Sequence, residues 1–446
     1  MKDIIKFLTI FSYKQKKELL FIFFLMLIGG VLESVGIGAI LPLISIMGQP
    51  DFLNTYPEIE PVMQEVGIVN HTDLVIVVAG LLVVLYILKN AFLTIELYIQ
   101  RRFTMKQQSL YAREILATYL AKPYIFHVNS NSAQLLRDVN IGPQYLFNTI
   151  LMSILYLLTE VITAISIWIM LVIVDPFTAI VVACVMSLII IAIIRSFRGR
   201  IVRQGEIVNT TSVEYLKWIN QSLGGIKETK ILGKESFFLS EFSKSYEKNA
   251  IAFQIYYFLS DIPRIIIELL VIVGLLGLII IKILLGDTPL DVIPVLGVLA
   301  MAAFRLMPSA NRIVGFYNAI KNQMPFFNEI YDVLMEIKIR LTNNTEVMPS
   351  ENYTEIPFRN VLQIKNVSFK YAKDKDLILD DISFEIAKGK FVGIIGPSGA
   401  GKTTLVDILL GLLKPTEGHI YCDDNDINQD YQAWQKNWPM FLRTFT

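Results

Sequence analysis

Six long apolar stretches constrain this chain more than any other feature of its sequence. A helix needs about 20 mainly apolar residues to cross the hydrocarbon core of a bilayer. Hydrophobic residues make up 54% of the 446 residues and charged residues only 18%, a composition too apolar for an average soluble protein. The sequence therefore predicts a membrane protein with six transmembrane helices. These stretches lie near residues 18–48, 74–99, 144–174, 176–196, 256–285 and 292–318.

The charge of the connections between these stretches predicts the orientation of the helices. Residues 49–73 contain five acidic residues and no lysine or arginine, whereas Arg101 and Arg102 directly follow the second stretch. Lysine and arginine are concentrated in short loops on the cytoplasmic side, so we place residues 49–73 outside. The N-terminus, residues 100–143 and 197–255 and the C-terminal part are then cytoplasmic. Both basic connections show helical periodicity with few breakers, so long cytoplasmic helical extensions are expected.

The chain becomes polar after about residue 320, and three later segments have strand patterns. LQIKNVSF (362–369) and ISFEI (382–386) alternate apolar and polar residues, as half-buried strands do. KFVGII (390–395) is continuously apolar, which is typical of a buried strand. A glycine-rich loop comes next, and TTLVDILLGLL (403–413) is expected to be a helix that Lys414 and Pro415 close.

The glycine-rich loop, GPSGAGKTT, matches the phosphate-binding pattern G-x-x-x-x-G-K-[ST]. Its glycines let backbone N–H groups converge on an anion, and the helix that starts here adds its positive dipole end. Lys402 is expected to reach the outer phosphates of ATP, and Thr403 to hold Mg²⁺. The alternative is an ordinary glycine turn, which the order of strand, loop and helix disfavours. The predicted nucleotide-binding residues of this loop are Gly396, Pro397, Ser398, Gly399, Ala400, Gly401, Lys402, Thr403 and Thr404.

These features define a fold class and three regions. The predicted fold is a membrane all-α domain of six transmembrane helices with long cytoplasmic extensions, followed by a partial α/β nucleotide-binding domain with the phosphate loop. We assign residues 1–320 to the transmembrane domain and 321–360 to a linker and the start of the cytoplasmic region. Residues 361–446 are assigned to the N-terminal part of the nucleotide-binding domain.

The six spans, the long inner loops and the phosphate loop together resemble an ATP-binding cassette exporter half-transporter, over essentially the whole chain. The resemblance implies a multi-pass protein of the bacterial inner or plasma membrane that works as a homodimer and has no nucleic-acid partner. It also implies that Tyr371 stacks on adenine, although a strand-end tyrosine that packs locally is an alternative. NSNSAQLLRDVN (129–140) and LGGIKETKILGKESFF (223–238) are similar to the family's two coupling segments.

A narrower resemblance lies in RLMPSANRI (305–313) and DIPRIIIE (261–268). Both resemble bacterial flippases that move lipid-linked oligosaccharides for protein glycosylation, which implies an anionic lipid-linked saccharide as the substrate. Lys89, Arg264 and Arg305 lie within predicted spans, where charges usually face a cavity or a partner. We predict that they line a cationic cavity. The alternatives are a local pair of Arg264 with Glu268 and a Lys89 that reaches the membrane surface.

The resemblance to the exporters breaks near the end of the sequence. The glutamine loop, the signature, the Mg²⁺-binding aspartate with its catalytic glutamate and the switch histidine are absent through Thr446. We therefore expect that this chain alone does not hydrolyse ATP, and that no complete set of catalytic residues is present. A frameshift near Asn437 is our hypothesis for the unusual WPMFLRTFT. Two alternative functions stay open: an exporter of peptides, lipids or drugs, and a non-catalytic membrane-bound remnant or binding subunit.

Overall fold

The structure is a computed structural model, and it describes residues 2–39, 43, 46, 71–174, 176–284, 289–343, 356–371 and 376–436. The chain forms two compact units. The helical unit contains Met1–Ile115, Arg137–Ser222 and Lys227–Asn344. The C-terminal unit contains Leu116–Leu136, Leu223–Ile226 and Thr345–Thr446. The expected frameshift region, residues 438–446, lies outside the described residues.

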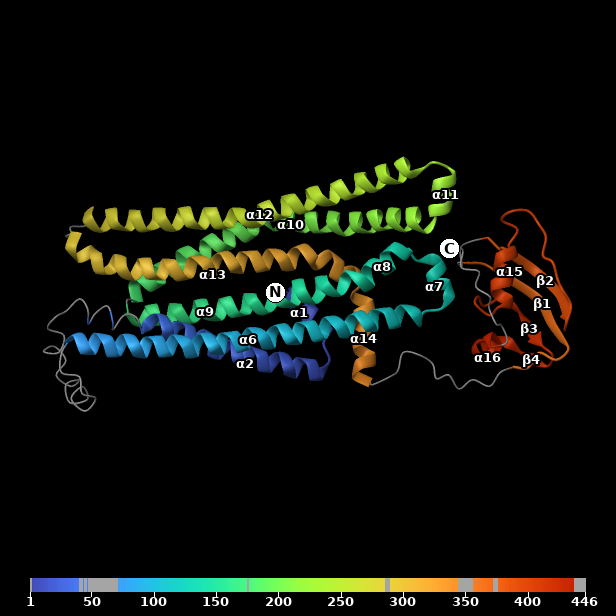
Figure 1. Cartoon of the computed structure of the whole chain (residues 1–446), viewed down its shortest axis with the longest axis horizontal. Helices are drawn as coiled ribbons and strands as arrows, with labels where there is room; N and C mark the ends of the chain where they lie inside the picture. Colours follow the sequence, from blue (N-terminus) through green and yellow to red (C-terminus); the bar gives the residue numbers. More distant parts are fainter. Residues whose placement is uncertain are drawn as a thin grey trace. The chain divides into compact units, whose positions relative to one another are not determined.

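Long helices dominate the helical unit (Figure 1). Each of the six apolar stretches falls largely on a helix, and the expected cytoplasmic extensions are helical, because α6 and α12 are each 50 residues long and α10 is 49. Among the described residues, Tyr13–Gly36, His71–Leu120 and Gln144–Met170 are long and apolar enough to cross a membrane. The helices are α1 (Lys2–Leu8), α2 (Tyr13–Gly38), α6 (His71–Leu120), α7 (Tyr124–Asn129), α8 (Ser132–Asn140), η2 (Gln144–Leu151), α9 (Met152–Val174), α10 (Pro176–Gly224), α11 (Ile226–Ile231), α12 (Glu235–Leu284), α13 (Pro289–Glu329) and α14 (Tyr331–Asn343).

The third apolar stretch begins as a π-helix, which the sequence pattern did not predict. Gln144–Leu151 forms η2, and the regular α-helix α9 continues from Met152 to Val174. Leu146, Phe147, Ile150 and Leu151 of this segment are buried. A π-helix is rare and usually short, so apolar periodicity alone cannot distinguish it from an α-helix.

An antiparallel sheet forms the core of the C-terminal unit. Its strands are β1 (Val361–Phe369), β2 (Leu379–Ala387), β3 (Glu417–Cys422) and β4 (Asn425–Asp426), in the order β2-β1-β3-β4. Ile364 of β1 pairs with Phe384 on one side and with Ile420 on the other. The sheet packs on α15 (Lys402–Leu409), the 3-10 turn η3 (Ile427–Gln429) and α16 (Tyr431–Gln435). The strands predicted at 362–369 and 382–386 are thus confirmed.

Two local predictions in this unit are wrong. Residues 390–397 do not form a strand, and the side chains of Phe391 and Ile395 are almost fully exposed. A parallel strand of an α/β core needs hydrogen-bonding neighbours, and the sheet of the described residues provides none for this segment. The helix after the loop also ends early, at Leu409. Gly411 has a φ of 72°, a left-handed conformation that typically ends a helix.

Candidate functional site

Two glycines give the loop before α15 its shape. Gly399 and Gly401 have φ values of 85° and 80°, and Gly401 is the N-cap of α15. Glycine adopts this left-handed conformation without the steric cost that other residues pay. A Cβ atom on Gly401 would also lie 2.9 Å from Cδ2 of Leu379 and 3.1 Å from the carbonyl oxygen of Ile378. The loop therefore passes so close to the start of β2 that only glycine fits at position 401.

Lys402 follows this glycine and folds back over the loop. Its Nζ atom donates hydrogen bonds to the carbonyl oxygens of Gly396 at 2.8 Å and Pro397 at 2.7 Å. Residues 391–400 are all exposed, and so is Thr403 in the first turn of α15. An anion at the N-terminus of α15 would find backbone N–H groups and the helix dipole there. The ammonium group is thus held at the place where a phosphate could replace the two carbonyl oxygens.

Tyr371 comes from the end of β1 and reaches the same helix. Its hydroxyl lies 3.1 Å from Oγ1 of Thr404, which is buried. The Tyr371 ring also packs edge-to-face on Phe369, with 5.0 Å between the ring centroids. The fold thus brings together the predicted adenine-stacking residue and the end of the predicted phosphate loop. Since the ring also packs locally, base stacking and local packing both stay open for Tyr371.

A cleft of about 1070 Å³ in the C-terminal unit lies beside Tyr371. Tyr124 and His127 of α7, Lys414 and Tyr431 also line it. Burial, and then the nearby charges of Asp407 and Tyr371, raise the pKa of the Tyr124 hydroxyl. Burial alone raises the pKa of Asp407. Tyr124, which lies just before the first predicted coupling segment at 129–140, is thus part of the surroundings of Tyr371 and the loop helix, within one unit.

The C-terminal end of α15 is held by a helix that sequence reasoning missed. The indole Nε1 of the buried Trp434 donates to the carbonyl oxygen of Leu409 at 2.8 Å, and Nε2 of Gln435 donates to that of Gly411 at 2.9 Å. The last carbonyl groups of a helix lack partners within the helix, so α16 supplies a donor to the last carbonyl group of α15 and another to the turn that follows it. Asp430 caps α16 by accepting from the Ala433 N–H at 3.0 Å. An aspartate before YQAWQ is a helix-start signal that could have revealed α16.

The three predicted cavity cations have different surroundings. Lys89 is buried in α6 against Gly36 of α2, and its Nζ lies 4.5 Å from the centroid of the Tyr86 ring. Arg264 of α12 is exposed, and so is Glu268 four residues later. In Figure 1, α12 and α6 run along opposite sides of the helical unit. The side chain of Arg305 lies outside the described residues.

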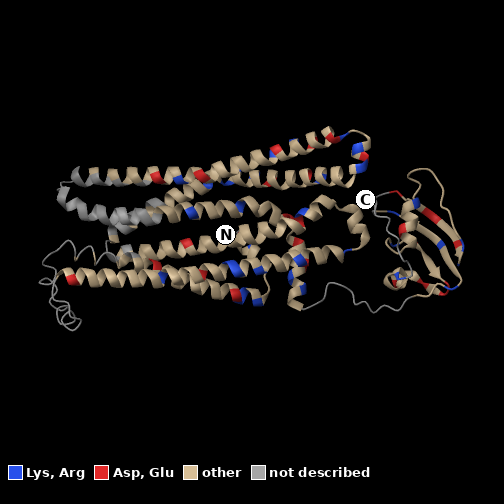
Figure 2. Ribbon diagram, viewed as in Figure 1, with Lys and Arg blue, Asp and Glu red and all other residues tan. Residues whose placement is uncertain are grey.

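Charges are distributed unevenly along the helical unit. Figure 2 shows residues of both signs around α8, α11 and α14, whereas the N-terminal half of α6 is mostly uncharged. Arg312 of α13 forms an ion pair with Glu160 of α9, with 2.5 Å between Nε and Oε1. This pair gives one of the charges in the predicted spans a partner. Among the described residues, no cluster of histidine, cysteine, aspartate and glutamate is suitable for a metal ion.

Comparison with known proteins gives matches for both parts of the chain. Residues 19–282, more than half of the chain, match the family described as ABC transporter transmembrane region, and residues 379–444 match the family described as ABC transporter. A bacterial Atm1-family ABC exporter with ATP bound has a similar structure, with a TM-score of 0.60 and 20% identity. The match covers 88% of this chain and 68% of that one. At this identity, the likeness concerns the fold alone.

Two curated relatives share shorter similarities. The energy-coupling factor transporter ATP-binding protein EcfA1 of Staphylococcus saprophyticus is 44% identical over 70 residues, which is 16% of this chain and 26% of that protein. A probable metal transport system ATP-binding protein of Chlamydia trachomatis is 54% identical over 57 residues, 13% of this chain and 24% of the relative. The chain thus spans about a quarter of the length of the curated relatives it matches.

Proposed function

The chain belongs to the ABC transporters, and from this membership we propose that it is an exporter half-transporter that binds ATP with Mg²⁺ through residues 396–404. The observation that carries the proposal is the close-packed Gly401 followed by Lys402, whose ammonium lies over the loop. The proposed protein is a multi-pass protein of a bacterial inner membrane, with its nucleotide-binding part in the cytoplasm, and it acts as a homodimer.

Different residues of the loop would bind the phosphates of the nucleotide and its Mg²⁺ ion. Lys402 now donates to the carbonyl oxygens of Gly396 and Pro397, and it would donate to phosphate oxygens instead when the loop N–H groups hold a nucleotide. The exposed hydroxyl of Thr403 would hold Mg²⁺. When bound, ATP supplies the free energy that an exporter needs to move its substrate. The close approach of α15 to β2 at Gly401 keeps the donors in place.

Nucleotide binding is tested by titrating the chain in lipid nanodiscs with a fluorescent ATP analogue and Mg²⁺. Lys402→Ala removes a charged hydrogen-bond donor, and hydrogen bonds to charged groups contribute about 1.5–3 kcal/mol. The expected result is a Kd raised by about 10- to 150-fold. Lys388→Ala removes an exposed lysine of the same unit and is the matched control, with an unchanged Kd. Equal affinity of Lys402→Ala and wild type contradicts the proposal.

The role of Tyr371 needs a separate comparison of ligands. If its ring stacks on adenine, Tyr371→Ala weakens the binding of ATP but not that of tripolyphosphate, and Tyr371→Phe binds ATP as wild type does. Local packing predicts instead that Tyr371→Ala weakens both ligands alike, since its hydroxyl contacts Thr404 in the loop helix. Isothermal titration with the two ligands therefore distinguishes the two roles.

The proposed substrate is an anionic lipid-linked saccharide that the protein moves as a flippase. Cations at Lys89, Arg264 and Arg305 would replace the water around its pyrophosphate, and the planar guanidinium group suits phosphate. The exposure of Arg264 supports this role. The test is binding of a pyrophosphate-linked lipid to the chain in nanodiscs. Arg305→Gln should weaken binding at least tenfold, whereas Arg312→Gln, whose charge is paired with Glu160, should not. Equal binding favours an exporter of peptides, other lipids or drugs.

A second candidate function is that of a nucleotide-binding membrane subunit without hydrolysis. The segment before the loop favours it, because residues 390–397 form no strand and have no strand partner in the described sheet. An ATPase assay in liposomes decides between the candidates. Vanadate-sensitive turnover by the chain alone contradicts this second function.

A further inference from the structure

Arg137 lies in a cytoplasmic connection but is one of the most deeply buried side chains of the helical unit. Its side chain is 1% exposed, and that of its neighbour Asp138 is 2% exposed. Sequence reasoning counts Arg137 among the basic residues of an inner loop, which are normally solvated. Burying a guanidinium group is expensive unless it is paired and hydrogen-bonded. Its surroundings must therefore supply acceptors for every N–H group.

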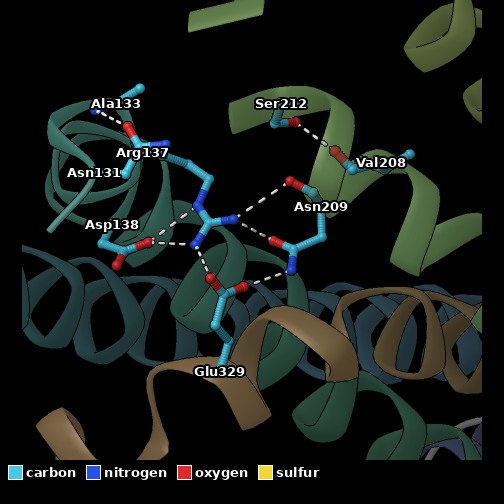
Figure 3. A network of polar contacts seen from close by, with 8 residues as sticks. All are labelled: Asn131, Ala133, Arg137, Asp138, Val208, Asn209, Ser212 and Glu329. Carbon is cyan, nitrogen blue, oxygen red and sulfur yellow. Dashed lines mark hydrogen bonds and ion pairs between the residues drawn. The ribbon is translucent and has the colours of Figure 1, made fainter. Parts of the chain in front are cut away.

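The acceptors come from three different helices, as Figure 3 shows. Nε and Nη2 donate to Oδ1 of Asp138 in α8 at 3.0 and 2.7 Å, and Nη2 donates to Oε1 of Glu329 in α13 at 2.8 Å. Nη1 donates to Oδ1 and the carbonyl oxygen of Asn209 in α10 at 2.6 and 3.3 Å. These five bonds match the five N–H donors of arginine. We call Arg137, Asp138, Asn209 and Glu329 the Arg137 cluster.

Two further contacts hold the Arg137 cluster together besides the hydrogen bonds that Arg137 donates. Nδ2 of Asn209 donates to the second carboxylate oxygen of Glu329 at 2.5 Å, so α10 and α13 are joined directly. The guanidinium carbon lies 5.1 Å from the centroid of the Phe326 ring, a cation–π distance. Lysine could not replace this arrangement, because its ammonium group is a single point donor without the planar fork.

Two glycines bring the helices of the Arg137 cluster unusually close. A Cβ atom on Gly205, one turn before Asn209 in α10, would lie 2.0 Å from the carbonyl oxygen of Asn322 in α13. A Cβ atom on Gly142, just after α8, would lie 2.6 Å from Cζ of Phe326. Backbone and ring atoms fill the space that side chains would need. The three helices therefore have little freedom to slide past one another near the cluster.

The three helices of the cluster are among those whose chain continues into the C-terminal unit. Leu116–Leu136 belongs to that unit and ends immediately before Arg137. α10 runs on to Leu223–Ile226, which also belongs to it, and α13 leads through α14 to Thr345–Thr446. The chain passes between the two units at five points, and the Arg137 cluster joins the helices that lead to three of them, α8, α10 and α13.

We propose that the Arg137 cluster makes α8, α10 and α13 move as one body, and that Arg137 is a positioning residue through which a change in the C-terminal unit reaches α10 and α13. The inference deepens the proposed function, because the change that matters to a transporter is the one caused by nucleotide. A buried ion pair alone is weak support for stability. The joint role rests instead on which helices the pair connects.

Hydrogen exchange of the whole chain in nanodiscs, without any nucleotide, tests whether the Arg137 cluster couples the three helices. In wild type, peptides from residues 132–140, 203–213 and 320–329 should exchange with one shared protection factor. Arg137→Lys should lower protection at least tenfold in the first peptide, and the three protection factors should diverge. Arg312→Lys is the matched control, since it weakens an arginine–carboxylate pair that joins α13 to α9 outside the cluster, and it should leave all three peptides alike.

Three results would overturn the proposal that the Arg137 cluster couples the three helices. They are unequal protection of the three peptides in wild type, no effect of Arg137→Lys on protection, or an equal loss of protection in all three peptides. Equal loss is what a purely stabilising residue would produce. If Arg137→Lys does not fold, Asn209→Ala removes one half-buried acceptor of the cluster and should separate α10 from the other two helices. Shared protection in Asn209→Ala would equally overturn the proposal.

Adding Mg²⁺ and ATP to the same samples tests the coupling by the Arg137 cluster separately from nucleotide binding. Wild type should show altered exchange both in residues 396–409 and in the three peptides. Arg137→Lys should keep the first change and lose the second, whereas a retained second change contradicts the coupling. No change in residues 396–409 of wild type contradicts the proposed nucleotide function only, because the measurement without nucleotide tests the coupling independently.

Discussion

Replacing Gly401 by alanine tests whether the phosphate loop is shaped by packing as well as by backbone freedom. Alanine would pay about 1–2 kcal/mol for the left-handed conformation at a φ of 80°. Its Cβ atom would in addition approach Leu379 to 2.9 Å and the carbonyl oxygen of Ile378 to 3.1 Å, and overpacking costs about 1–3 kcal/mol. Since α15 carries core residues Ile408 and Leu409, the loop cannot shift without disturbing the core.

Gly399→Ala is the matched control, because Gly399 has a φ of 85° but no atom within 4 Å of an added Cβ. Gly399→Ala should lose only the free energy of placing alanine in the left-handed conformation, so Gly401→Ala should be less stable than Gly399→Ala by about 2 kcal/mol. The assay is hydrogen exchange of the core strands β1 and β3 in the whole chain. A difference of this size makes exchange about 30-fold faster in Gly401→Ala than in Gly399→Ala. Equal exchange in the two variants would refute the packing argument.

Three further predictions concern other parts of the fold. Trp434→Phe leaves a buried carbonyl oxygen at the end of α15 without its donor and should cost about 1–3 kcal/mol, measured by hydrogen exchange of the C-terminal unit. Hydrogen bonds from the N–H groups of Val361, then Arg359 and Asn360, lower the pKa of Asp423. The contribution of Asp423 to folding stability is therefore complete above the ordinary aspartate pKa of about 3.9, and it disappears as the pH falls through the lowered pKa. Asp423→Asn should therefore make the protection of β1 less dependent on pH in this acid range. Gly205→Ala should destabilise the α10–α13 contact by about 3 kcal/mol. Gly199 lies in the same helix with no atom within 4 Å of an added Cβ, so Gly199→Ala should stabilise α10 by up to about 1 kcal/mol. Equal effects of the two variants on hydrogen exchange in α10 would contradict the close approach of α10 to α13 at Gly205.

Local patterns in the sequence predict most of the architecture. Apolar length and helical periodicity are properties of contiguous residues, so the helices and their long extensions could be located before any contact was known. The loop at 396–404 could be identified for the same reason, since its glycines, lysine and threonine act within one turn of chain and helix. Alternation likewise predicted β1 and β2.

Patterns fail where the outcome depends on neighbours distant in sequence. KFVGII has the composition of a buried strand, but a strand exists only when another strand pairs with it, and the described sheet has none beside it. Trp434 could not be recognised as the residue that holds the end of α15, because its partner Leu409 lies 25 residues away. The position of Tyr371 beside Thr404 also depends on how β1 packs on α15.

Length, hydropathy and a contiguous motif need no distant partner, so the sequence alone predicts a membrane protein with long helices and a phosphate loop. Only the tertiary structure reveals that Arg137 is a buried, fully hydrogen-bonded residue and not a solvated loop residue. Its five donors are satisfied by groups from α8, α10 and α13, which lie up to 192 residues apart in the chain. Burial of a charge is favourable only when folding delivers every acceptor at once, and no local pattern encodes that meeting.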